Sequence, residues 1–154
     1  MNKPKYVSEI AVDNWVLRWP YVSLDQFDKI EKMTIDTLDE LNTLCLYGSS
    51  QNSWSHRINS DYRSSGTGQH PKGRAVDIVF YERKPGDVDV LTQFFFALRF
   101  NGLMGVGFYP FWNTPGIHVD TRQNVKYKAL WWLDKDGKYK SPDEYIKQLR
   151  AVRV

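Results

Sequence analysis

Two segments of the chain place polar side chains where apolar ones are expected. Asp77 lies in the middle of Ala-Val-Asp-Ile-Val-Phe, residues 75–80, which alternates like a largely buried strand. In Gly-Ile-His-Val-Asp-Thr, residues 116–121, His118 and Asp120 share one strand face. A carboxylate among apolar neighbours is partly desolvated, so it needs a cation, strong hydrogen-bond donors or a proton. Both segments therefore indicate a buried polar site.

A third polar residue, His70, lies seven residues before Asp77 in a loop between Gly68 and Gly73. Two histidines and one carboxylate are a common zinc-binding set that leaves the fourth position open to water. Taken singly, a strand aspartate is more often salt-bridged and a strand histidine more often simply packed. Two of the chain's three histidines fall in this set, so the pattern favours a metal site at His70, Asp77 and His118.

The elements that must position these residues follow from hydrophobic periodicity and turn signals. We expect a short strand over 15–19, helices over 24–47, 87–100 and 142–151, and strands over 54–60, 75–81, 105–109, 117–121 and 129–133. Trp131 and Trp132 are adjacent and face opposite ways, so one is expected in the core and the other can border a cleft, although core packing is the favoured interpretation of both. Helices and strands do not alternate strictly, which predicts an α+β fold with a mostly antiparallel sheet and flanking helices.

Composition limits the class of protein. The 154 residues are enough for one domain, and 42% hydrophobic with 25% charged residues is globular. The formal net charge of +3 comes without a basic block, so nucleic-acid binding is not expected. Met-Asn-Lys-Pro-Lys leads into no apolar run, and no run approaches about 20 apolar residues, so we expect neither a signal peptide nor a membrane span.

Four motifs together resemble the zinc D-Ala-D-Ala carboxypeptidase family, which includes phage and bacterial peptidoglycan peptidases. They are Ser-Asp-Tyr-Arg ending at Arg63, His-Pro-Lys-Gly-Arg-Ala-Val-Asp-Ile from His70, Gly-Val-Gly-Phe-Tyr from Gly105, and Gly-Ile-His-Val-Asp ending at Asp120. The resemblance covers about residues 55–135. It implies a single zinc peptidase-like domain over 1–154 with the fold that these peptidases share with hedgehog signalling domains.

The resemblance also assigns roles to individual residues. It implies that zinc is bound by His70, Asp77 and His118, and that Arg63 contacts the substrate and can stabilise a developing oxyanion. Many members carry an acidic general base three residues before the second zinc histidine, where this chain has Pro115. Asp120 is the nearest replacement, either as the base or as a partner that orients a ligand or a neighbouring side chain. Glu82, just past its strand, is a poorer candidate for the base.

Two functions are therefore expected. The first is a zinc metallopeptidase that hydrolyses stem or crossbridge peptides of peptidoglycan, in phage-type cell-wall degradation. The second is a non-catalytic zinc-containing module that binds the wall or forms part of a virion, beside other virion proteins. In both cases the protein would be made in the cytoplasm and would act at the cell wall, after lysis or as part of a virion.

Overall fold

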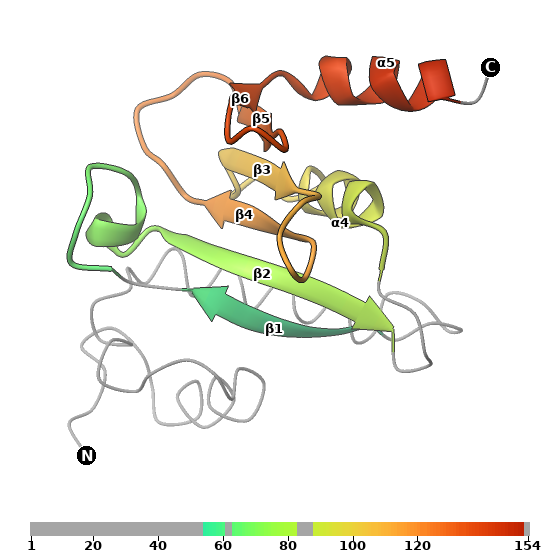
Figure 1. Cartoon of the computed structure of the whole chain (residues 1–154). Helices are drawn as coiled ribbons and strands as arrows, with labels where there is room; N and C mark the ends of the chain where they lie inside the picture. The colour runs from blue at the N-terminus through green and yellow to red at the C-terminus, as the bar shows by residue number, and fades with distance from the viewer. Residues whose placement is uncertain (1–53, 61–62, 83–87, 153–154) are drawn as a thin grey trace.

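The structure is a computed structural model that describes residues 54–60, 63–82 and 88–152. Its elements are β1 (Trp54–Ser60), the 3-10 helix η1 (His70–Lys72), β2 (Ala75–Glu82), α4 (Val90–Ala97), β3 (Gly105–Tyr109), β4 (Gly116–Asp120), β5 (Ala129–Leu133), β6 (Tyr139–Lys140) and α5 (Pro142–Val152). These elements form one sheet with helices beside it (Figure 1).

The sheet has six strands in the order β1-β2-β4-β3-β5-β6. Every neighbouring pair is antiparallel except β3 and β5, which run parallel. The structure therefore confirms the predicted fold class, a mostly antiparallel sheet with flanking helices. The neighbouring strands β2 and β4, the second and third in this order, carry Asp77 and His118.

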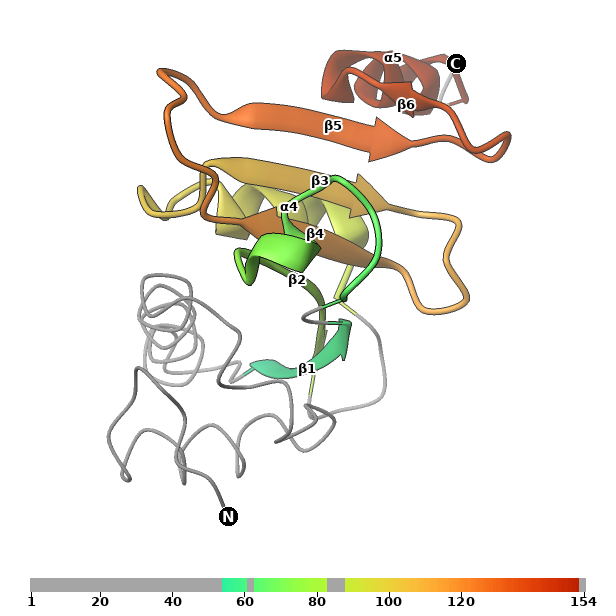
Figure 2. The same ribbon diagram turned by 90° about the vertical axis from the view of Figure 1, so that its left-hand side faces the viewer.

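One face of the sheet forms the hydrophobic core. Alternating side chains of the four central strands are almost fully buried there: Val76, Ile78 and Phe80 from β2, Val106 and Phe108 from β3, Ile117 and Val119 from β4, and Trp132 from β5. Helix α4 covers this face through Val90, Phe94 and Ala97. The other face carries the polar residues, and η1 lies over it, in front of β2 and β4 when α4 is behind them (Figure 2).

Helix α4 begins where the sequence supplies a cap. The Asp89 side chain accepts hydrogen bonds from the backbone N–H groups of Leu91 and Thr92 at 3.0 and 3.2 Å, which satisfies donors that a helix start leaves unpaired. One helical turn later, Gln93 is fully buried. Its amide accepts from the Phe80 N–H at 3.0 Å and donates to the carbonyl of Val88 at 2.8 Å. Gln93 therefore ties the helix to the end of β2.

The predicted elements between residues 54 and 152 are confirmed: β1, β3 and β5 have the expected ends, and the ends of the others shift by at most three residues. The largest change is in α4, which is shorter than the helix expected over 87–100. The strand expected over 15–19 and the helix expected over 24–47 lie outside the described residues. In the part of the chain that the structure describes, no helix is long and apolar enough to cross a membrane.

Candidate metal centre

The first residue of the site, His70, is held by a tight turn above the sheet. It begins η1, and its carbonyl accepts the N–H of Gly73 at 3.1 Å. Gly73 has φ of 69°, a left-handed conformation that a residue with a side chain adopts only with strain. The turn bends the chain back into β2 within a few residues. His70 is 4% exposed, so its imidazole lies under the loop rather than in solvent.

The other two residues face each other across neighbouring strands. Asp77 of β2 is directly opposite His118 of β4 in the antiparallel register. Side chains of opposed residues in such a pair lie on the same face and within contact. Each of the two residues is 8% exposed. The strand pairing therefore fixes two thirds of the site, and the η1 turn adds the third member.

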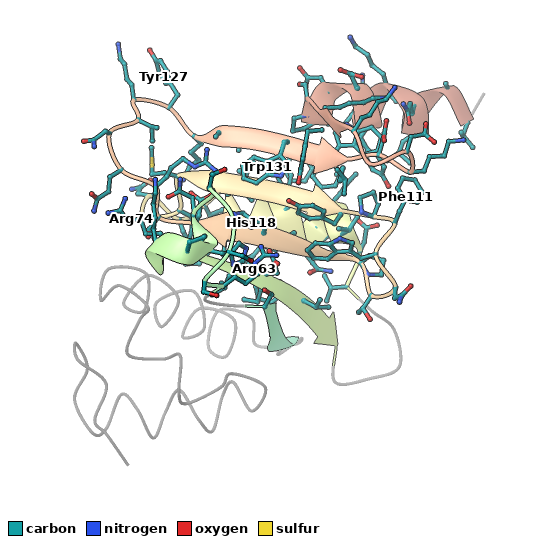
Figure 3. The ribbon with its side chains drawn as sticks, turned by 60° about the vertical axis from the view of Figure 1, so that its left-hand side comes forward. Arg63, Arg74, Phe111, His118, Tyr127 and Trp131 are labelled. Carbon is teal, nitrogen blue, oxygen red and sulfur yellow. The ribbon has the colours of Figure 1, made fainter. Side chains whose placement is uncertain are left out.

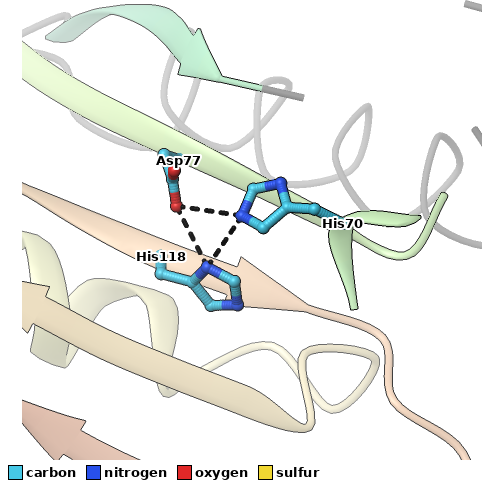
Figure 4. Close-up of side chains that lie close together, drawn as sticks. All are labelled: His70, Asp77 and His118. Carbon is cyan, nitrogen blue, oxygen red and sulfur yellow. Dashed lines mark hydrogen bonds and ion pairs between the residues drawn. The ribbon is translucent and has the colours of Figure 1, made fainter. Parts of the chain in front are cut away.

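The three side chains converge on one point (Figure 4). Asp77 Oδ1 lies 3.0 Å from His118 Nδ1 and 3.4 Å from His70 Nε2, and the two ring nitrogens are 3.3 Å apart. Ligands about 2.0–2.1 Å from a tetrahedral zinc are separated by about 3.3–3.4 Å from one another. The three donor atoms are therefore spaced as a tetrahedral metal would need, and this buried group could hold a metal ion.

Asp120 holds the far side of the His118 ring. Its Oδ2 lies 3.0 Å from His118 Nε2, so Nδ1 is the nitrogen that faces Asp77. The carboxylate is itself fixed by Arg122, which donates from Nε to Oδ1 at 2.8 Å and from Nη2 to Oδ2 at 2.6 Å. The backbone N–H of Arg122 adds a bond to Oδ1 at 3.1 Å. A carboxylate on the second nitrogen of a metal-binding histidine fixes the tautomer and orientation of the ring.

The charges of the site are set by these contacts. Burial raises the pKa of Asp77, but hydrogen bonds and charge from His118 and His70 outweigh it and lower the pKa to about 2. Burial likewise raises the pKa of Asp120, yet the bonds from Arg122 and His118 hold it well below its usual range. Burial lowers the pKa of His118, whereas its bonds to Asp120 and Asp77 raise it more, to above its ordinary value. Both carboxylates are thus ionised at neutral pH.

Glycines on β3 leave the space that the site residues occupy. Gly105 and Gly107 lie opposite Asp120 and His118 in the register of β3 and β4. A Cβ on Gly105 would lie 2.2 Å from the Asp120 carboxylate, and a Cβ on Gly107 would lie 2.2 Å from the Trp131 indole. Any side chain at either position would displace its neighbour. The glycines therefore allow Asp120 and Trp131 to lie flat across β3.

A cleft of about 650 Å³ opens in front of the three metal-binding candidates. Its walls include two arginines and four aromatic side chains: Arg63, Arg122, Tyr109, Trp112, Trp131 and Tyr139. Arg63 and Trp131 lie on the same side of the sheet as His118 (Figure 3). The guanidinium of Arg63 is 4.0 Å from Asp77 Oδ2, and its side chain is 54% exposed. Arg63 can therefore reach a ligand bound beside Asp77.

The structure brings all five predicted site residues together, but it does not give Asp120 access to the cleft. Asp120 is 0% exposed and does not line the cleft. Among the described residues that line it, Asp77 is the only carboxylate. Pro115 uses its carbonyl to accept a bond from Gln93 at 3.3 Å. The side chains of His56 and Glu82 lie outside the described part of the chain.

Sequence reasoning missed the residues that surround the metal-binding group. Arg122 and Tyr109 were not selected, although Arg122 follows Asp120 by only two residues. The alternation Gly-Val-Gly at residues 105–107 was also a signal, because glycine at every second position of a strand leaves one face open to a neighbour's side chain. Of the adjacent tryptophans, Trp132 is in the core at 1% exposed, as expected, whereas Trp131 borders the cleft, where core packing had been the favoured interpretation.

Comparison with protein-family models, with curated proteins and with solved structures finds no match to this chain. The described residues therefore establish a mixed fold of helices and a mostly antiparallel sheet, and a buried group of two histidines and one aspartate that could hold a metal ion.

Proposed function

We propose that the chain is a zinc-dependent peptidase with the hedgehog and DD-peptidase type of fold, acting on stem or crossbridge peptides of peptidoglycan. The observation that supports it best is the spacing of the three donors, which lie 3.0 to 3.4 Å apart and line a cleft. The motif resemblance of residues 55–135 supplies the substrate class. Delivery to the wall by lysis or within a virion belongs to the same proposal.

The chemistry of the donors fits zinc. Imidazole nitrogens and a carboxylate oxygen are ligands that zinc accepts in tetrahedral sites, whereas calcium and magnesium prefer oxygen ligands alone. Bound zinc acidifies a water molecule and polarises a carbonyl group. His70 Nε2, Asp77 Oδ1 and His118 Nδ1 would hold the ion, with Asp120 and Arg122 keeping the His118 ring in orientation.

Arg63 serves the substrate in this proposal. Its side chain is about half exposed and lines the cleft, and its guanidinium lies 4.0 Å from the Asp77 carboxylate. A fixed cation there can hold the carbonyl oxygen of a peptide and stabilise the negative charge that it gains during attack. Its contact to Asp77 is long, at 4.0 Å, so Arg63 can exchange this contact for one to a ligand without a large cost.

The decisive experiment is digestion of purified peptidoglycan with the protein, with and without a chelator, followed by mass analysis of the released fragments. The proposal expects new peptide termini that disappear with chelator and return with added zinc. A matched Asp77→Asn variant should release nothing. Fragments that persist in chelator, or no fragments from fully zinc-loaded protein, would exclude a zinc peptidase.

A second function is favoured by one observation. Asp77 is the only carboxylate among the described residues that line the cleft, and Asp120 is buried against Arg122. A peptidase needs a group that takes a proton from the attacking water. The alternative is therefore a non-catalytic zinc-containing module that binds wall peptides or forms part of a virion. Zinc-loaded protein that binds purified wall without cutting it would favour this alternative.

A further inference from the structure

We propose that the Tyr109 hydroxyl is a ligand-binding group of the metal centre, which donates a hydrogen bond to an oxygen atom of the bound ligand. The proposal rests on the zinc site proposed above and adds a donor on the flank of β4 away from Arg63. Tyr109 was not among the predicted site residues, and it belongs to the aromatic wall of the cleft.

The position of Tyr109 follows from the strand register. Gly105, Gly107 and Tyr109 alternate along β3 and lie on the face that carries His118. Tyr109 lies opposite Gly116, which is two residues before His118 on β4. Because glycine has no side chain, Gly116 puts none between the Tyr109 ring and the cleft. The residue is 7% exposed and lines the same cleft as His70, Asp77 and His118.

Trp131 determines which way the Tyr109 hydroxyl can point. The absence of a side chain on Gly107 lets the indole lie across β3, where its ring is 5.3 Å from the His118 ring. From there the indole Nε1–H donates a hydrogen bond to the Tyr109 oxygen at 2.9 Å. Indole nitrogen is only a donor, so it cannot accept the proton of Tyr109. The hydroxyl proton must therefore be given to another acceptor.

The Tyr109 ring is also fixed by stacking. It packs against Trp112 with ring centroids 4.0 Å apart and planes 13° apart. Burial raises the pKa of the Tyr109 hydroxyl above its ordinary value, despite the opposing effect of the bond from Trp131. The group therefore keeps its proton at neutral pH. A rigid neutral donor of this kind is suited to an oxygen that gains negative charge.

Tyr139 is a second neighbour of the Tyr109 hydroxyl, and its charge and hydrogen bonding contribute to the raised pKa of Tyr109. It is 69% exposed and lines the same cleft. An exposed phenol gives up such a bond to solvent at little cost, because water replaces it. A ligand oxygen that enters the cleft can therefore take the place of Tyr139 as the acceptor of the Tyr109 proton.

The test measures binding of acetohydroxamate, a small zinc-binding oxyanion, to zinc-loaded protein by titration calorimetry. Tyr109→Phe keeps the ring and its stacking on Trp112 but removes the donor. We expect its hydroxamate affinity to fall about 10-fold or more, as for loss of one bond to a charged oxygen, with zinc content unchanged. Trp131→Phe should give a smaller loss, because the donor remains but is no longer oriented. Tyr127→Phe, at a position 74% exposed and outside the cleft, is the matched control.

The outcomes separate the two proposals. If wild type binds zinc and hydroxamate, and Tyr109→Phe binds both equally well, the role of Tyr109 is refuted while the zinc site stands. If Tyr109→Phe loses hydroxamate affinity and wild type still cuts no wall peptide, the donor is supported and the peptidase is not. A wild type that binds no zinc overturns both. With an active enzyme, Tyr109→Phe should lower kcat about 10²–10³-fold and leave KM nearly unchanged.

Discussion

Replacing Asp120 with asparagine separates its two predicted roles, because the substitution preserves shape and removes charge. The carboxylate is fully buried, receives three hydrogen bonds from Arg122 and contacts His118 Nε2. Asparagine has only one accepting oxygen, so its NH₂ group must face a donor from either Arg122 or the histidine ring. Loss of such a partner weakens metal binding about 10–100-fold, which is about 1.4–2.7 kcal/mol. We expect Asp120→Asn to bind zinc that much more weakly.

The assay is a competition titration of zinc against a chromophoric chelator, with wild type and variant at the same pH. Asp89→Asn is the matched control, since asparagine caps a helix as well as aspartate does, and its zinc affinity should not change. Gly105→Ala reaches the same carboxylate from β3, where the added Cβ would lie 2.2 Å from it. It should weaken zinc at least as much as Asp120→Asn.

A different pair of results for Asp120→Asn would contradict the positioning role. If Asp120→Asn bound zinc with wild-type affinity but lost hydrolysis by about 10²–10⁴-fold, Asp120 would be acting as the proton-transfer group. The inference from its burial and its bonds to Arg122 would then be wrong. If hydrolysis falls and is restored by excess zinc, the positioning role is supported.

Further substitutions test other parts of the site and fold. Arg63→Ala should lower hydrolysis about 10²–10³-fold with little change in melting temperature, because the side chain is 54% exposed; marked unfolding with unchanged activity would reverse this assignment. Gln93→Leu should lower the free energy of unfolding by about 1–3 kcal/mol, measured by urea denaturation, because the buried Phe80 N–H loses its acceptor; equal stability would contradict it. Removing zinc with a chelator should lower the melting temperature, since an ion at about 1,000 times its dissociation constant stabilises the fold by about 4 kcal/mol; an unchanged melting curve would show that the folded state holds no zinc.

Much of the sheet could be predicted because its strands have strong local signals. Alternation in β2 and β4 identified which residues share a face, and this was enough to bring Asp77 and His118 together as candidates. The adjacent tryptophans of β5 were assigned opposite faces for the same reason. These predictions succeeded because a strand turns alternate side chains to opposite sides whatever its neighbours are.

The surroundings of the metal-binding group could not be predicted because they depend on which strands are neighbours. Nothing local places β3 between β4 and β5, and this order is what lays Trp131 across Gly107 toward His118. The hydrogen bonds between Asp120 and Arg122 could not be predicted either, because the sequence does not show that Asp120 is buried. From its spacing alone, a carboxylate two residues past His118 was also consistent with a general base. The orientation of the Tyr109 side chain depends on its contacts with Trp112 and Trp131, which come from separate segments of the chain.

Metal analysis of protein purified without added chelator addresses the His70, Asp77 and His118 group itself. Samples should be measured as purified and after reconstitution with zinc, beside a His118→Ala variant prepared in the same way. We expect one zinc per chain in the wild type and a sharp loss in the variant, because the remaining two donors cannot complete the site. Wild-type protein that holds much less than one zinc per chain, with no increase on reconstitution, would contradict the zinc centre and the functions built on it.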